Sequence, residues 1–159
     1  MEQRDFDGFY AAHFDDVARA ISLAAGDREL ARDATQEAFA RALRRWRTVR
    51  DMDRPDGWVY VVAMNQLRDH WRRLERRRPT EQIAVDTSGA VVTRLSVRDA
   101  IATLPPRQRQ AVVLRYLADL PLADVANAMG CALGTVKATL HEALRAMRVE
   151  LEEDEHADE

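Results

Sequence analysis

The chain has 159 residues, of which 47% are hydrophobic and 32% are charged, and its formal net charge is −3. This composition is typical of a globular protein, and no apolar run approaches the roughly 18 residues that a membrane-spanning helix needs. The first residues show neither a basic start nor an apolar signal segment, so we expect a cytoplasmic protein.

Charge is distributed unevenly along the sequence. Residues 1–40 carry a net charge of −5, residues 41–78 of +7, residues 79–94 of −1, residues 95–149 of +3 and residues 150–159 of −7. Binding to a polyanion depends on the local field rather than on the total charge. The two basic blocks therefore indicate two separate contacts with such a partner.

The first 78 residues have the apolar spacing of three helices. The first runs from Asp5 to about Leu23, and Gly26 offers the left-handed residue that ends a helix. Asp27 can cap the second helix, and Pro55 suits the first turn of the third. The apolar stripes of the second and third helices are Leu30, Ala34, Ala38, Ala42 and Trp46, and Val59, Val62, Ala63, Leu67, Trp71 and Leu74. These three helices predict a compact bundle.

Residues 79–94 contain turn formers and show no helical period, so we interpret them as a flexible linker. Fully extended, such a segment reaches roughly 55 Å. That reach would let two DNA-binding domains occupy separated sites.

The second half predicts four helices. A short one lies around Ser96–Leu104, and the next is opened by Pro105-Pro106, with Val112, Val113 and Leu117 facing inward. Residues 121–129 form a third, in which Leu122, Val125, Ala126 and Met129 are expected to be buried. Gly130 turns the chain, and Thr135 starts a helix with the apolar stripe Val136, Leu140, Leu144, Met147 and Leu151. Two helices split by a glycine turn are typical of the helix-turn-helix motif, whose second helix enters the major groove.

The third helix combines the side chains that are needed to hold unpaired bases. Cations bind phosphate, rings stack on bases, and polar groups reach base edges. The candidates are Trp58, Tyr60, Asn65, Arg68, Asp69, Arg72, Arg73 and Arg76. Trp58 could equally pack in the core, and Trp71 lies on the apolar stripe. The expected base-reading face of the last helix presents Thr135, Lys137, Ala138, His141, Glu142 and Arg145.

Four stretches resemble extracytoplasmic-function sigma factors, which retain only regions 2 and 4 of the sigma-70 family. Residues 33–39, Asp-Ala-Thr-Gln-Glu-Ala-Phe, are similar to region 2.2, and residues 58–73 to regions 2.3 and 2.4. Leu-Pro-Pro-Arg-Gln-Arg at 104–109 and Gly-Thr-Val-Lys at 134–137 are similar to region 4.

The resemblance implies an all-α fold with region 2 at 1–78, a linker at 79–94, region 4 at 95–152 and an acidic tail at 153–159. It also implies that Asp33, Gln36, Glu37 and Arg41 bind the β′ clamp helices of RNA polymerase. The third helix would bind and melt the −10 promoter element. Region 4 would read the −35 element and contact the polymerase β flap. An anti-sigma factor is a further implied partner, and no cofactor is expected.

The sequence departs from the family in the last helix. Ala138 and Thr139 follow Lys137 where a small residue and an arginine are common, and Glu142 stands where a basic residue is common. Glu142 could accept a hydrogen bond from cytosine N4 or could only lower the affinity for DNA. We therefore expect tight promoter contact only together with polymerase.

Two other classes of function are alternatives to a sigma factor. A stand-alone helix-turn-helix regulator would bind duplex DNA without polymerase, usually as a dimer. An enzyme would need converging catalytic groups, but the four histidines share no spacing that suggests one site, and no phosphate-binding glycine loop is present.

Two smaller features carry weaker expectations. The single cysteine, Cys131, excludes an internal disulfide, makes a poor metal site and is expected to be buried. The acidic tail is expected to be disordered, with autoinhibition by competition with DNA as the alternative.

Overall fold

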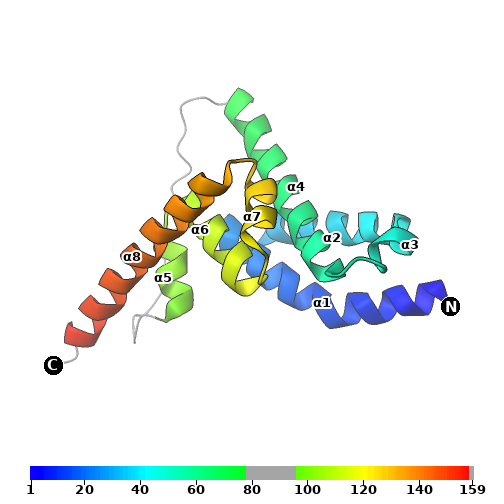
Figure 1. Cartoon of the computed structure of the whole chain (residues 1–159), viewed down its shortest axis with the longest axis horizontal. Coiled ribbons are helices and arrows are strands. Elements are labelled where there is room, and N and C mark those ends of the chain that lie inside the picture. Colours follow the sequence, from blue (N-terminus) through cyan, green and yellow to red (C-terminus); the bar gives the residue numbers. More distant parts are fainter. Residues whose placement is uncertain (78–95, 158–159) are drawn as a thin grey trace.

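The computed structural model describes residues 1–77 and 96–157, with residues 150–157 as backbone only (Figure 1). The predicted linker lies outside the described residues. The first half of the chain contains α1 (Glu2–Ala25), α2 (Arg28–Arg44), α3 (Trp46–Val49) and α4 (Pro55–Arg77). The second half contains α5 (Val97–Thr103), α6 (Pro106–Val112), η1 (Val113–Leu117), α7 (Leu122–Met129) and α8 (Leu133–Ala157). All regular structure within these ranges is helical, so the all-α prediction is confirmed.

Local capping rules place the helix ends in the first half where the sequence predicted them. Gly26 adopts φ 68°, and its N–H donates to the carbonyl of Ser22, which closes α1. The Asp27 carboxylate accepts from the backbone N–H of Leu30 at 3.1 Å, and α4 begins at Pro55. One boundary differs, because the second helix breaks at Arg45 and Trp46 starts the separate short helix α3.

Aromatic side chains pack together where the N-terminal half of α1 meets α2 and α3. The Phe6 and Trp46 rings meet edge to face with centroids 5.3 Å apart, and Tyr10 meets Phe39 in the same way at 5.2 Å. Phe39 is 2% exposed. These contacts fix α1 against α2 and α3, which leaves the polar side of α2 toward solvent.

In the second half, helix geometry corrects two expectations. Leu117 was expected to face inward but is 49% exposed, because Val113–Leu117 form a π-helical turn that adds a residue and rotates the side chains that follow. Leu144 was expected in the buried stripe of α8, but it is exposed and Ala143 is buried instead. The buried positions 136, 140, 143 and 147 follow the 3.6-residue period more closely than a strict repeat of four.

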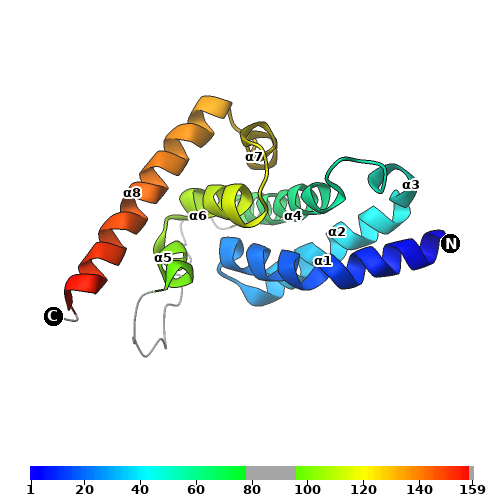
Figure 2. The same cartoon turned by 60° about the horizontal axis from the view of Figure 1, so that its bottom comes forward.

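The acidic end also differs from the expectation, because α8 continues as a helix to Ala157. Neither proline nor glycine follows Gly134, and Glu, Leu and Ala are strong helix formers. The backbone of residues 150–157 therefore continues along the α8 axis and does not fold back over the start of α8 (Figure 2). Cys131, expected to be buried, is only half-buried in the turn between α7 and α8.

The two halves of the chain pack against each other. In both views α7 lies beside α4, and α6 lies beside the C-terminal end of α1 (Figures 1 and 2). Buried residues of both halves belong to one hydrophobic cluster. Across the described ranges, no helix combines the length and the apolar character that crossing a bilayer requires.

Candidate nucleic-acid interface

One side of α4 presents a row of polar and charged side chains. Trp58, Asn65, Asp69, Arg72 and Arg76 are spaced by three, four or seven residues, so they lie on one side of the helix. Trp58 and Asn65 are half-buried, whereas the last three are exposed. Within residues 1–77 and 96–149, these three have no side-chain hydrogen bond or ion pair. This end of α4 is therefore available to a polyanion.

Arg73 extends the exposed row, again without a side-chain partner among the described residues. Because the exposed row carries three guanidinium groups and one carboxylate, its net charge favours phosphate. The half-buried Trp58 keeps part of its ring accessible near the start of α4.

Tyr60 does not join this row. It lies two residues, or about 200°, around the helix from Trp58 and is only 6% exposed. Burial, together with the carboxylates of Asp16 and Asp56, raises the pKa of Tyr60 to about 12. The structure thus separates the two rings that the sequence analysis grouped together.

Arg68 is also engaged within the protein. Its Nη1 donates to the carbonyl oxygen of Ala128, at the C-terminal end of α7, at 2.9 Å. The predicted −10 surface of α4 is therefore divided, because its second half is open while Arg68 is occupied by the other half of the chain.

The residues that were predicted to contact polymerase lie together on α2. Asp33 and Gln36 are exposed. Glu37 accepts from Arg41 Nε at 3.0 Å and from Arg44 Nη2 at 3.4 Å. The hydrogen bond from Arg41 lowers the pKa of Glu37, so this surface carries a fixed negative charge flanked by two guanidinium groups.

The start of α8 presents the predicted base-reading residues together. Thr135, Lys137, Ala138, His141, Glu142 and Arg145 are all exposed. Lys137, His141, Glu142 and Arg145 make no side-chain hydrogen bond or ion pair with any described residue. The α7 helix, the left-handed Gly130 with φ 65° and α8 have the arrangement of a helix-turn-helix motif.

Two arginines with long-range contacts were missed by the sequence analysis. Arg54 forms two hydrogen bonds with Asp56, the shorter being 2.8 Å, and this pairing lowers the pKa of Asp56. Arg109 is only 3% exposed. It precedes the buried Val112 and Val113 by three and four residues, so its helical spacing could have placed it on the apolar face. Nothing in the local sequence distinguishes Arg54 from the neighbouring exposed arginines.

A cationic row on one helix together with a helix-turn-helix motif on two others is typical of a two-part DNA-binding protein. Both parts of the chain match models of protein families. Residues 9–77 match the model described as "Sigma-70 region 2", and residues 94–147 match "Sigma-70, region 4".

Relatives cover nearly the same length. The chain is 33% identical over 155 residues to the RNA polymerase sigma-E factor of Streptomyces coelicolor, covering 94% of this chain and 88% of the relative. It is 33% identical over 138 residues to the ECF RNA polymerase sigma factor SigL of Mycobacterium tuberculosis, covering 80% and 78%.

Two solved structures share the fold. The sigma factor RpoE of Bartonella quintana, in complex with the anti-sigma factor NepR, aligns with a TM-score of 0.73 at 19% identity, covering 94% of this chain and 98% of that one. CnrH, in complex with the cytosolic domain of CnrY, aligns with a TM-score of 0.58 at 22% identity, covering 96% and 90%.

The chain belongs to the extracytoplasmic-function sigma factors of the sigma-70 family. It functions as an RNA polymerase sigma factor, a subunit that binds core polymerase and promoter DNA.

Proposed function

We propose that α4 binds and helps to melt the −10 element while the start of α8 reads the −35 element as duplex. The observation that carries this proposal is the exposed row Asp69, Arg72, Arg73 and Arg76 on α4. No described residue neutralises its cations, and it lies on the same helix as the partly accessible Trp58 ring.

Capture of unpaired bases explains how the chain could open a promoter without ATP. Stacking one base on an aromatic ring contributes about 1–3 kcal/mol, which is comparable to the cost of unstacking that base. Phosphate contacts by Arg72 and Arg73 would hold the strand, while Asn65 and Asp69 would meet base edges. Binding energy then shifts the equilibrium toward the open state.

The α8 surface is suited to a weaker contact. Lys137 and Arg145 provide cations, but Glu142 between them reduces the local positive charge. The −35 contact would therefore depend on polymerase to bring the duplex and α8 together.

The proposal also covers the contacts with polymerase, the functional units of the chain and a protein that regulates it. The face with Asp33, Gln36, Glu37 and Arg41 docks on the β′ clamp helices, and region 4 contacts the β flap. The functional units are residues 1–78, 79–94, 95–152 and 153–159. Because NepR accompanies RpoE, and CnrY accompanies CnrH, in the solved neighbours, we extend the proposal to an anti-sigma protein that controls this chain in the cytoplasm. The chain itself catalyses no reaction.

Run-off transcription with purified core polymerase and a genomic promoter library tests the function. Specific transcripts are expected, and their start sites would identify both promoter elements. The absence of any specific transcript, with the chain failing to join the core enzyme, would contradict the proposal.

A gel shift without polymerase tests the alternative of a stand-alone regulator. A sigma factor should shift duplex promoter DNA only together with core enzyme. A stable shift by the chain alone would favour the regulator, although the match to region 2 over residues 9–77 argues against it.

A further inference from the structure

A pocket of about 500 Å³ lies where the start of α1 meets the end of α2 and the short helix α3. The C-terminal end of α4, with its exposed cationic row, points away from these segments (Figure 1). The volume is in the range of sites for small molecules, which is about 300–1,000 Å³. None of the residues proposed to bind DNA or polymerase lines this pocket. It is therefore a separate feature of the first half of the chain.

Arginines give the pocket its charge. Arg44, Arg45 and Arg47 line it and are exposed, and Glu2 is the one acidic residue among its lining side chains. Nε of Arg47 donates to Glu2 at 3.1 Å, whereas Arg45 makes no side-chain hydrogen bond or ion pair with any described residue. Three guanidinium groups against one carboxylate attract anions, and the planar guanidinium fork suits phosphate oxygens.

Trp46 adds a hydrogen-bond donor that has no acceptor. Trp46 lines the pocket and is 8% exposed, because its ring packs against Phe6 and Phe9 with centroids 5.3 Å and 5.0 Å away. The indole Nε1 atom is buried and has no hydrogen-bond partner among the described residues. A buried donor without an acceptor destabilises the fold. A ligand oxygen that reached this N–H would remove that cost.

Leu43 gives the same pocket an apolar wall. Its side chain is 42% exposed at the end of α2, although it is large and hydrophobic. The pocket thus offers cations for phosphate and an apolar surface for a planar ring. A nucleotide carries both of these parts in one molecule, whereas an inorganic anion carries only the first.

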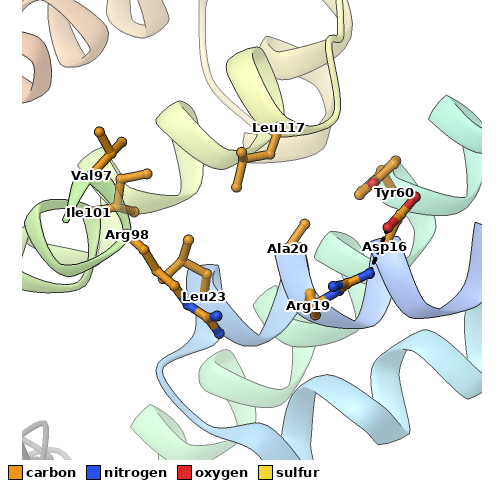
Figure 3. A pocket seen from close by; sticks show the side chains of 9 residues that line it. All are labelled: Asp16, Arg19, Ala20, Leu23, Tyr60, Val97, Arg98, Ile101 and Leu117. Atoms are coloured by element: carbon orange, nitrogen blue, oxygen red, sulfur yellow. Dashed lines mark hydrogen bonds and ion pairs between the residues drawn. The ribbon is translucent and has the colours of Figure 1, made fainter.

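A second cavity, of about 350 Å³, lacks this combination. It lies between the two halves of the chain, where Leu23 of α1 faces Ile101 and Leu117 (Figure 3). One of its two arginines, Arg19, is bound to Asp16 at 3.0 Å. Among its lining residues, no buried side-chain polar atom lacks a hydrogen-bond partner. This cavity serves as the comparison for the pocket beside Trp46.

We propose that the pocket lined by Leu43, Arg44, Arg45, Trp46 and Arg47 binds a nucleoside polyphosphate. The guanidinium groups hold the phosphates, and Leu43 packs against the base. After a small rotation of a pocket side chain, the indole N–H of Trp46 donates to a phosphate oxygen. The inference goes beyond the proposed function and does not depend on it, because no residue of this pocket is assigned to DNA or to polymerase.

The first test observes Trp46 directly in the full-length chain. Labelling with fluorotryptophan gives one fluorine NMR resonance for each of Trp46, Trp58 and Trp71, and Trp58→Phe and Trp71→Phe assign them. At constant ionic strength, ATP or GTP up to about 1 mM should shift the Trp46 resonance to saturation, whereas adenosine and guanosine should not. The absence of a shift with both nucleotides, or an equal shift with the nucleosides, would overturn the inference.

Replacement of Arg45 by Gln tests the cations. Arg45 is exposed and unpaired among the described residues, so its loss should leave the fold intact. The affinity for ATP, measured by isothermal calorimetry, should fall by about tenfold. The matched control is Arg98→Gln, which removes the same charge from an exposed arginine that lines the cavity of Figure 3. The control should stay within about twofold of the wild type, and equal losses would contradict the site.

Trp46→Phe tests the unpartnered donor, because it keeps an aromatic ring and removes only the N–H end of the indole. We expect the affinity for ATP to fall by about tenfold, since a charge-assisted hydrogen bond is lost. The free energy of unfolding without ligand should not fall in parallel, because the removed donor has no partner in the free chain. Unchanged affinity for ATP in this variant would refute the proposed geometry.

Two further probes separate a nucleotide site from weaker alternatives. ATP should bind the wild type more tightly than inorganic triphosphate does, and Leu43→Ser should remove this difference. Equal affinity of the two compounds for the wild type would mean an adventitious anion contact only and would overturn the proposal. A shift of the Trp46 resonance by a single-stranded oligonucleotide, with none by ATP or GTP, would instead assign the pocket to the DNA backbone.

Discussion

The two helices proposed to face DNA differ in charge and in accessibility. The open part of α4 carries three arginines against one carboxylate, yet α7 packs on the same helix and takes Arg68. The predicted base-reading residues at the start of α8 are all exposed, but Glu142 offsets part of the charge of Lys137 and Arg145. The surface with the stronger attraction for a polyanion is therefore also the one from which an arginine, Arg68, is taken by the other half of the chain.

The largest expected effect comes from Asp69→Ala combined with Arg72→Ala on the open part of α4. Both side chains are exposed and without partners among the described residues, so the fold should be kept. Loss of two charge-assisted contacts to DNA should lower open-complex formation by about a hundredfold. Permanganate footprinting measures this step, and core binding should stay within about twofold. Equal losses in both assays would contradict the assignment of DNA melting to α4 and of polymerase binding to α2.

The buried side of α4 gives the second prediction, through Tyr60. Its pKa of about 12 lies above the value of about 10 for an unfolded chain. Below pH 10 the Tyr60 hydroxyl is neutral in both the folded and the unfolded chain, and its contribution to stability is fully present. This contribution is lost as the pH rises from 10 to 12. We expect a loss of about 2 kcal/mol in the free energy of unfolding from this group. Urea denaturation of Tyr60→Phe should lack that part of the loss, while Tyr116→Phe, at an exposed tyrosine, should retain it.

The third prediction concerns α2, which carries neither DNA surface. Asp33→Ala combined with Glu37→Ala should weaken binding to core polymerase by about tenfold, because the change removes two carboxylates and frees Arg41 and Arg44. Fluorescence anisotropy with labelled core enzyme measures this affinity. Open-complex formation at saturating protein should change little, and a selective defect in melting would contradict the assignment of this face.

The smallest effect is expected on α8. Replacement of Glu142 by Gln removes one negative charge and should raise the affinity of the holoenzyme for duplex promoter DNA by about two- to threefold at low salt. Measurements at two salt concentrations should show the gain shrinking as salt rises. A loss of affinity at one promoter only would instead mean that Glu142 reads a base.

Much of the fold could be predicted because its rules are local. Gly26 and Gly130 were assigned from their position after amphipathic stretches, and Asp27 and Pro55 from capping preferences, and all four hold these roles in the structure. The two wrong predictions of buried residues have geometric causes. A π-helical turn moved Leu117 to the surface, and the 3.6-residue period favoured Ala143 over Leu144 in the core.

The sequence by itself determined the helices, their exposed cations and the family. Only the tertiary structure decided which cations are available. Arg54 meets Asp119 across 65 residues, and Arg109 meets Ala24 across 85. Their acceptors are backbone carbonyls, which every residue has, so no pattern of side chains marks them in advance. The carbonyls become specific partners only when folding places a helix end beside an arginine.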